Sequence, residues 1–181
     1  MTQDRLDLIQ NIHKDHKIDE IVYCKYQILQ RLYQDPDLFE VLHNTELEEQ
    51  GAIPEDYKNV NIFSFMRIPD TQSTVKNFVC FEVDDTEPSL QNNMIIKKVV
   101  RFRTISHKDD IETGYGIDRQ DLLAMIIKDL FNWSTLLNMQ MKKVYDKGYI
   151  AENGYYYRDI HYVLEMANSP QRGTTNNFKY R

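Results

Sequence analysis

The sequence predicts an α+β fold, in which a mainly antiparallel sheet carries a crossing helix and follows an N-terminal helical segment. Three features of the pattern support this. Apolar residues recur at three- and four-residue spacing over residues 18–34, alternate with polar residues from about residue 60, and return to helical spacing near residue 117. With 181 residues, 41% hydrophobic and 28% charged, the chain has the composition of one soluble globular domain.

The N-terminal part predicts two helices separated by a proline. The first is expected over residues 18–34, because Asp19 and Glu20 stand near its start, where negative charge is favourable. Proline cannot continue a helix, so residues 35–37 end it, and one further short helix is expected after them. Residues 45–59 are polar and are expected to form a connector.

The next part predicts strands. Residues 61–66 form a short candidate strand. The runs over residues 78–83 and 94–107 are joined by a polar turn and predict an antiparallel hairpin. A final strand is expected over residues 156–166, interrupted near residues 158–159.

The crossing helix is expected over residues 118–133. A glycine-containing loop precedes it, and Asp118 and Asp121 place negative charge at its N-terminus. Its apolar stripe consists of Leu122, Leu123, Ile126, Ile127 and Leu130. A stripe this wide must be covered, so we expect the helix to lie across the sheet and an aspartate at Ile126 or Leu130 to unfold the protein.

Three segments are therefore predicted. They are an N-terminal helical segment over residues 1–44, an α+β body over residues 45–167 and a C-terminal tail over residues 168–181. The tail is rich in Ser, Pro, Gly, Thr and Asn and has no apolar periodicity, so we expect it to be flexible.

Charge and aromatic content limit the classes of partner. The net charge of −6 argues against general wrapping of nucleic acid, which needs a basic face. A local basic patch is present in the sequence, but on a strand such residues are best explained as the solvated face; it comprises Lys97, Lys98, Arg101 and Arg103. Twelve Tyr and eight Phe indicate a β-rich body or a chain that buries surface against partners.

Cysteine usage and hydropathy suggest a reducing compartment. Cys24 and Cys80 belong to no C-x-x-C pair, so buried free thiols are expected. No apolar run is long enough to cross a bilayer, and the first residues lack the pattern of a secretory signal. We expect a protein that stays in a cytoplasm, or in an assembly built there, without a membrane partner.

Two groups of residues are candidate metal sites, one a histidine pair and the other a histidine with two aspartates. His13 and His16 are three residues apart, but they lie in a polar segment, and zinc needs three or four converging ligands. His107, Asp109 and Asp110 follow a strand, a position where metal-dependent hydrolases build sites, although these residue types are also ordinary in loops. The preferred interpretations are exposed histidines for the first group and ordinary loop residues for the second.

Other catalytic patterns are weaker still. Asp70, Glu82 and Asp84 have no specific nuclease spacing. The glycines at 114 and 116 lack the third glycine and the Lys-Ser/Thr ending of a phosphate-binding loop. The sequence therefore predicts no catalytic residue, no cofactor and no metal, and the chain is not expected to be an enzyme.

The order of these elements resembles a family of tailed-phage neck proteins, the head–tail joining and tail-completion group. The resemblance covers about residues 20–166. It rests on the helical pair, on residues 61–71 and 78–84, on the long strand that ends at His107, and on the segment 116–124. That segment is similar to the G-x-R-x-D-x-[IL]-[AS] helix entry of such proteins, but two residues, Ile117 and Asp118, stand between Gly116 and Arg119 where the pattern has one.

The resemblance implies a virion structural protein. Terminator-like members of the group have a small α/β fold and form rings, usually hexamers, whereas adaptors are mostly helical and stoppers are mostly β-barrels. A sheet with a crossing helix fits the terminator-like members best. The implied partners are further copies of the chain, the adjoining neck and tail-tube proteins, and DNA that passes through the lumen without specific binding. The implied location is the neck of a virion assembled in the host cytoplasm.

Five residues are expected at interfaces, and two other functions remain open. The predicted interface residues are Arg101 and Arg103 on the sheet and Arg172, Phe178 and Tyr180 in the tail. The alternative function is a metal-dependent nuclease or hydrolase that uses His107, Asp109 and Asp110. A third possibility is a cellular regulatory module that pairs through its N-terminal helices.

Overall fold

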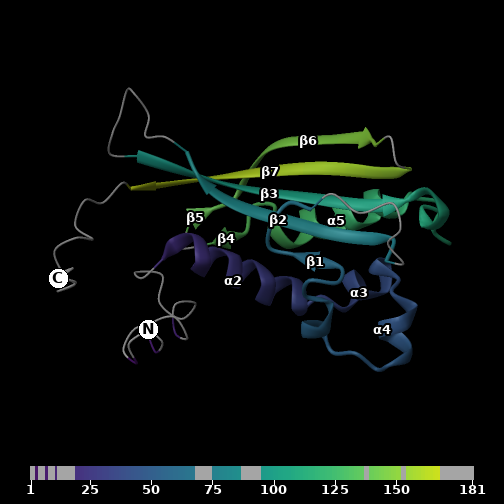
Figure 1. The fold of residues 1–181 in the computed structure, drawn as a ribbon. Helices are drawn as coiled ribbons and strands as arrows, with labels where there is room; N and C mark the ends of the chain where they lie inside the picture. The colour runs from purple at the N-terminus through teal and green to yellow at the C-terminus, as the bar shows by residue number, and fades with distance from the viewer. Residues whose placement is uncertain are drawn as a thin grey trace.

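Helices cover one face of a five-stranded mixed sheet in the computed structural model (Figure 1). The structure describes residues 19–67, 75–86, 95–136, 139–151 and 154–167, together with positions 3, 7 and 11. The strand order is β1-β2-β3-β7-β6, and the remaining two strands, β4 and β5, form a small separate ribbon. The predicted α+β class is confirmed.

The elements follow the order expected from the sequence. The helical elements are α2 Glu20–Tyr33, α3 Pro36–Leu42, α4 Thr45–Glu49, η2 Pro54–Tyr57, η3 Lys108–Asp110 and α5 Arg119–Phe131. The strands are β1 Ile62–Phe63, β2 Asn77–Asp85, β3 Ile95–His107, β4 Thr135–Leu136, β5 Met139–Gln140, β6 Lys142–Ile150 and β7 Tyr155–Ala167. Strand β1 pairs parallel to β2, and the pairs β2–β3, β3–β7 and β6–β7 are antiparallel, which confirms the predicted hairpin.

Side-chain caps explain where the first helices begin. Asp19 caps α2 by accepting a hydrogen bond from the backbone N–H of Val22. Asp35 caps α3 in the same way, and Pro36 occupies the first turn, where its missing N–H costs nothing. The predicted connector over residues 45–59 differs from the structure, because it contains α4 and η2. Asn44 caps α4 by accepting a hydrogen bond from the backbone N–H of Leu47. The polar composition of the segment made this helix start hard to recognise.

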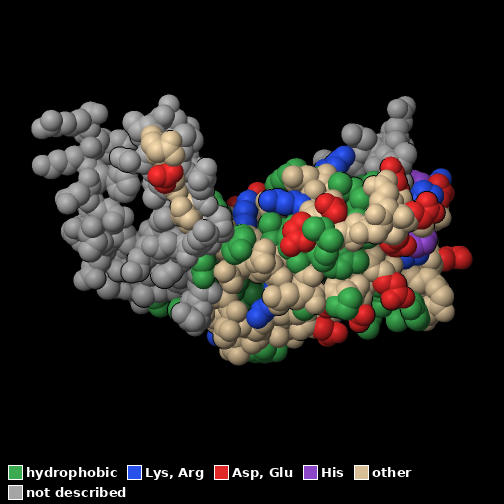
Figure 2. Space-filling view, turned by 90° about the horizontal axis from the view of Figure 1, so that it is seen from below, with side chains coloured by type: hydrophobic (Ala, Val, Ile, Leu, Met, Phe, Trp, Pro, Cys, Tyr) green, Lys and Arg blue, Asp and Glu red, His purple; other side chains and the backbone are tan. Residues whose placement is uncertain are grey.

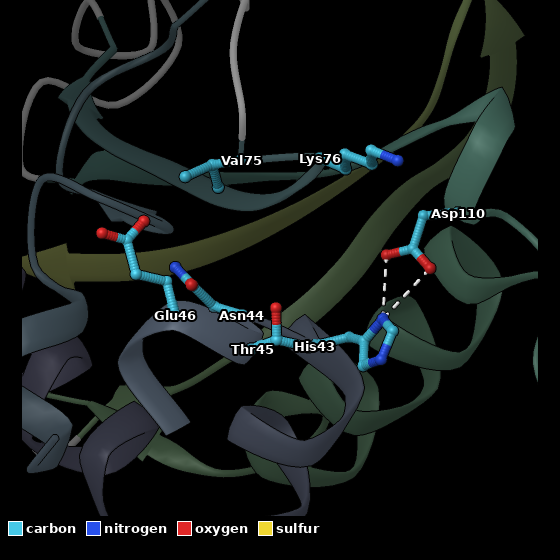
Figure 3. A pocket seen from close by; sticks show the side chains of 7 residues that line it. All are labelled: His43, Asn44, Thr45, Glu46, Val75, Lys76 and Asp110. Atoms are coloured by element: carbon cyan, nitrogen blue, oxygen red, sulfur yellow. Dashed lines mark hydrogen bonds and ion pairs between the residues drawn. The ribbon is translucent and has the colours of Figure 1, made fainter. Parts of the chain in front are cut away.

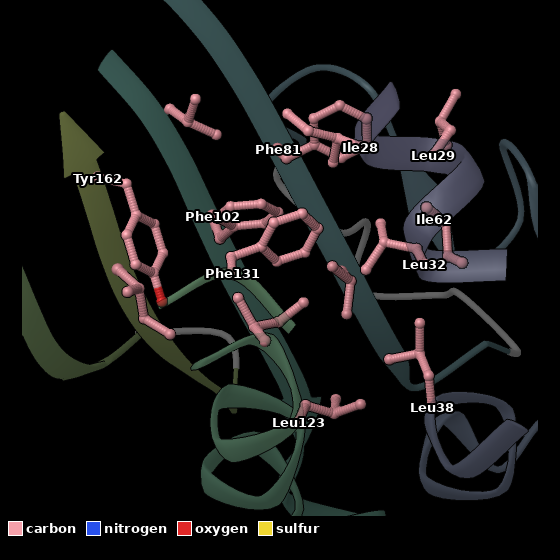
Figure 4. Packing of buried hydrophobic residues seen from close by; sticks show 14 of the residues in the cluster. Ile28, Leu29, Leu32, Leu38, Ile62, Phe81, Phe102, Leu123, Phe131 and Tyr162 are labelled. Carbon is pink, nitrogen blue, oxygen red and sulfur yellow. The ribbon is translucent and has the colours of Figure 1, made fainter. Parts of the chain in front are cut away.

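The main core lies between the helices and one face of the sheet (Figure 4). Phe102 of β3 is central to it, with its ring centroid 4.7 Å from that of Phe131 at the end of α5. Ile28 of α2 and Leu38 of α3 belong to the same cluster. Helices α2 and α3 and the distant helix α5 therefore share one core with the sheet.

Helix α5 lies across the sheet as predicted. Leu123 and Ile127 of the predicted stripe are completely buried, whereas Leu122, Ile126 and Leu130 are partly buried and pack at the margin of the core. The buried face also includes Ala124 and Phe131.

Three details of the predicted sheet are corrected. β7 runs without interruption through residues 158–159, because Arg158 pairs with Asp146 and Asp121, and Asp159 pairs with Arg103. β6 was not predicted as a strand. Lys98 was expected on the solvated face, but its side chain is only 1% exposed and lies on the helix-covered face.

Candidate functional site

The face of the sheet that carries Arg101 and Arg103 is called the open face here. Its apolar part is a small cluster that contains no helix residue: Phe63, Phe78, Cys80, Ile105 and Tyr155. Beyond this cluster the open face consists largely of charged and aromatic side chains from β2, β3, β6 and β7. It contains both of the interface residues predicted on the sheet.

Both predicted arginines have partners within the chain. Arg103 forms two hydrogen bonds to the carboxylate of Asp159, from Nε at 2.6 Å and from Nη2 at 2.8 Å, and lies over the ring of Tyr157. Arg101 lies 2.7 Å from a carboxylate oxygen of Asp84 and remains 41% exposed. Their role in an interface stays a prediction, and Arg101 is the more accessible of the two.

Aromatic stacking continues across the open face. The rings of Tyr145 on β6 and His161 on β7 stack with centroids 4.6 Å apart. Burial lowers the pKa of His161, and the nearby charges of Arg101 and Arg103 act in the same direction against the opposing effect of Asp159. Neutral imidazole is therefore the favoured form at this position.

Strand β6 forms an exposed edge of the sheet. In the described part of the chain β7 is its only strand partner, and the side chains of Val144 and Ile150 are 60% and 77% exposed. A β-bulge lies between Lys143 and Tyr145. The strand contains three lysines and one aspartate, and that aspartate, Asp146, is engaged by Arg158. We call this strand the basic edge.

A groove of about 380 Å³ adjoins the start of the basic edge. Val144 and Val163 supply apolar walls, and Lys97 and Lys142 stand among the lining residues. Glu165 also lines the groove and pairs with Lys97 at 3.3 Å. The groove therefore combines an apolar surface with flanking positive charge.

The opposite edge of the sheet carries negative charge. Residues 35–57, which include α3, α4 and η2, contain eight Asp and Glu and no Lys or Arg. All of these carboxylates except Asp35 are exposed. We call this region the acidic lobe; Figure 2 shows red side chains recurring at the right-hand end of the molecule, where α3 and α4 lie in Figure 1. Ile53, 58% exposed, is an apolar side chain within it.

The structure separates the three residues of the alternative enzyme function into two groups. Nδ1 of His107 lies 3.2 Å from a carboxylate oxygen of Asp109, and the His107 ring packs edge-on against Tyr155. Asp110 instead contacts His43, Asn77 and Arg119. The described residues contain no group of three or more His, Cys, Asp or Glu that could hold a metal ion.

Asp110 lies at a polar pocket of about 260 Å³ beside the end of α3 (Figure 3). Nδ1 of His43 is 3.1 Å from both of its carboxylate oxygens, Nδ2 of Asn77 is 2.6 Å from Oδ2, and Nη2 of Arg119 is 3.2 Å from Oδ1. Arg119 also donates to the carbonyl oxygen of Val41. The carboxylate thus joins the end of α3, the start of β2 and the start of α5, and these contacts hold the three elements together.

Lys98 is a second buried ionic contact. Its ammonium lies 3.2 Å from Glu20 at the start of α2 and bonds to Asp85 at the end of β2. Burial acts to lower the pKa of Lys98, but the hydrogen bonds and charges of Asp85 and Glu20 outweigh it, so the pKa lies above its ordinary value. Lys98 therefore fastens the first turn of α2 to the sheet.

Some predictions fall outside the described residues. These are the histidine pair at 13 and 16, Asp70, and the tail with Arg172, Phe178 and Tyr180. Among the described helices, none has the length and apolar character that crossing a bilayer requires.

The surfaces at the two sheet edges were not anticipated, although the sequence carries a signal for each. The run without Lys or Arg over residues 35–57 marks the acidic lobe. The lysines at 142, 143 and 147 mark the basic edge. Neither signal indicates where the segments lie in space, and only the fold places them at opposite edges.

Comparison with known families identifies the group to which the chain belongs. The model of the YomW family matches residues 35–164, a span that includes the acidic lobe, α5 and the basic edge. The chain is therefore a member of the YomW family, which is phage-associated. The predicted relation to phage proteins is confirmed at this level. No curated protein matches the chain.

Proposed function

We propose that this YomW-family protein is a structural subunit of a tailed-phage neck, a ring-forming tail terminator or head–tail connector that joins the capsid portal complex to the tail. The observation that carries the proposal is the basic edge in a phage-associated family. An edge strand that pairs on one side alone, with Val144 and Ile150 exposed, is a surface that gains stability by contact with another chain.

The architecture supports the same role. A sheet with a helix across it is the arrangement that the resemblance implied for terminator-like neck proteins. β3 and β7 are each 13 residues long and pair along their whole length, which gives a rigid body on which contact surfaces keep their positions. The net charge of −6 suits a subunit that lines a channel through which DNA slides without binding.

Disruption of the gene in a phage that encodes this chain tests the proposal. A stop codon early in the gene should yield filled heads and separate tails in the lysate, and expression of the intact gene in trans should restore joined particles. Mass spectrometry of purified wild-type particles should detect the protein. Normal yields of infectious particles that lack the protein would refute a neck role.

We also propose that the chain has no catalytic function. His107→Ala with Asp109→Ala removes two of the three residues of the hydrolase alternative and leaves Asp110, which joins three elements, in place. The double variant should fold and should complement the disrupted gene as well as the wild type. A folded variant that fails to complement, together with metal-dependent cleavage of DNA by the wild type, would favour the enzyme.

A further inference from the structure

The two edges of the sheet differ in charge and in shape. The basic edge is an uncovered strand with lysines at 142, 143 and 147. The other edge is β1, a strand of two buried residues. The acidic lobe ends at residue 57, shortly before β1 begins at Ile62. Figure 1 shows β6 at the top of the molecule and α3 and α4 at the bottom right, so one copy cannot bring these surfaces together.

Pairing of two basic edges is disfavoured. A β-bulge lies between Lys143 and Tyr145, and bulges interrupt the register that strand addition needs. An antiparallel pair of β6 strands would also bring lysines of both copies close together, and like charges across a strand pair are destabilising. Lysines on an edge strand are a common means of preventing such pairing.

The acidic lobe has the features that complement the basic edge. Ile53 is exposed and is flanked in sequence by Glu49 and Glu55. The groove at the basic edge has apolar walls from Val144 and Val163, with lysines around them. An apolar contact surrounded by opposite charges is the usual anatomy of a specific interface, in which the centre supplies affinity and the rim supplies orientation.

We infer that the basic edge of one copy binds the acidic lobe of a second copy, with Ile53 directed to the groove beside β6. The contact is head-to-tail, because it joins two different surfaces, and a bound pair leaves one basic edge and one acidic lobe free. Repetition of a head-to-tail contact builds a ring when the rotation between copies closes. The contact rests on the ring-forming role proposed above and names the surfaces that would build the ring.

Charge-reversed variants of the full chain test the contact. The edge variant is Lys142→Glu with Lys147→Glu, which leaves the Lys143 pair with Asp146 intact. The lobe variant is Glu49→Lys with Glu55→Lys; both glutamates are exposed. The control matched to the lobe variant is Glu112→Lys with Asp129→Lys, which makes the same change in net charge as the lobe variant at exposed positions outside the lobe.

Assembly state is measured by native mass spectrometry and light scattering after chromatography. The wild type and the control should form the same closed oligomer at low salt and should dissociate toward 1 M salt, where the screening length falls to about 3 Å. Each reversed variant alone should be monomeric with unchanged circular dichroism. An equimolar mixture of the two variants should reassemble, because each reversed surface then meets a reversed partner.

The outcomes separate this contact from its alternatives. If the lobe variant assembles normally while the edge variant does not, two β6 edges pair and the inference is wrong. A wild type that stays monomeric at low salt, or a mixture that stays monomeric although both variants are folded, also overturns it. A failed contact leaves the neck role open, because that role is tested by the presence of the protein in virions. Absence of the protein from virions would refute the neck role and would say nothing about the contact.

Discussion

The helix-covered face and the open face are built by alternate residues of the same strands, yet they are stabilised by different contacts. On the covered face, Phe81 and Phe102 pack with apolar residues of α2 and α5, and the buried ammonium of Lys98 pairs with Glu20 and Asp85. On the open face, Arg101 and Arg103 alternate with those residues and form ion pairs. The covered face therefore determines most of the stability of the fold, while the side chains of the open face remain accessible.

The free energies expected for the two kinds of contact support this division. Burial of a large apolar side chain contributes about 1.5–3 kcal/mol. An exposed ion pair contributes about 0–1 kcal/mol. Changes on the covered face should therefore unfold the protein, and changes on the open face should alter partners more than stability.

The largest effect is expected in the helix–sheet interface. Ile127→Asp places an unpaired charge in the completely buried face of α5 and should lower the free energy of unfolding by about 3–5 kcal/mol. The same change at the margin, Ile126→Asp or Leu130→Asp, should also unfold or aggregate the protein. Met125→Asp is the control, because Met125 is 42% exposed on the same helix. Equal melting temperatures for Ile127→Asp and Met125→Asp would show that the buried face is misassigned.

A smaller effect is expected at the charged contact of the covered face. Lys98→Met keeps the length of the side chain but removes its bonds to Glu20 and Asp85, and should lower the free energy of unfolding by about 1.5–3 kcal/mol. The first turn of α2 should lose protection from hydrogen exchange before the sheet does. Lys97→Met, at a lysine 49% exposed on the open face, should change stability by less than about 0.5 kcal/mol. Unchanged exchange in α2 would contradict the role assigned to Lys98.

The covered face could be predicted from the sequence and the open face only in part. Helical spacing over 18–34 and 118–133 and alternation over 78–83 record which residues avoid water. These patterns identified α2, the hairpin and, through Leu123 and Ile127, the side of α5 that faces the core. The same reasoning failed at Lys98 and at Arg158, because the local pattern of a strand cannot show that a distant carboxylate will neutralise a charge.

The candidate surfaces were harder to predict because they depend on topology. β6 contains Lys, Asp and Gly, which resemble loop composition, and it becomes a strand because β7 supplies its hydrogen-bond partners. Asp110 was noticed in the sequence as part of a metal group with His107. Its actual partners, His43 and Asn77, are 67 and 33 residues away in the chain.

Acid should weaken the ionic network that joins β6, β7 and α5. Burial acts to raise the pKa of Asp146, but the hydrogen bonds and charges of Arg158, Lys143 and Lys128 outweigh it and hold the pKa below its ordinary value of 3.8. Because the folded pKa is the lower one, this contribution to stability is present above about pH 4 and is lost as the pH falls through the folded pKa.

Asp146→Asn tests this pH dependence. The variant should be about 1–2 kcal/mol less stable than the wild type at pH 7, and the difference should shrink below pH 4, as measured by urea denaturation at a series of pH values. Asp129→Asn, at an exposed position on α5, is the control. A difference that stays constant from pH 7 to pH 2 would show that Asp146 contributes through packing and not through its charge.

The smallest effect on stability, and the sharpest test of the open face, is expected at Arg101. Its ion pair with Asp84 is exposed, so Arg101→Ala should change the free energy of unfolding by less than about 1 kcal/mol. Arg103→Ala should cost more, because it leaves the buried carboxylate of Asp159 without its two hydrogen bonds.

Any loss of function in Arg101→Ala can therefore be assigned to a lost contact and not to unfolding. The ring contact inferred above lies at the sheet edges, so this variant should form the wild-type oligomer. If the open face docks on an adjoining protein in the neck role proposed above, the variant should yet yield fewer joined phage particles by electron microscopy. An Arg101→Ala protein that assembles and joins particles at wild-type levels would remove the open face from the list of contact surfaces, while one that fails to form the oligomer would move the ring contact from the edges to this face.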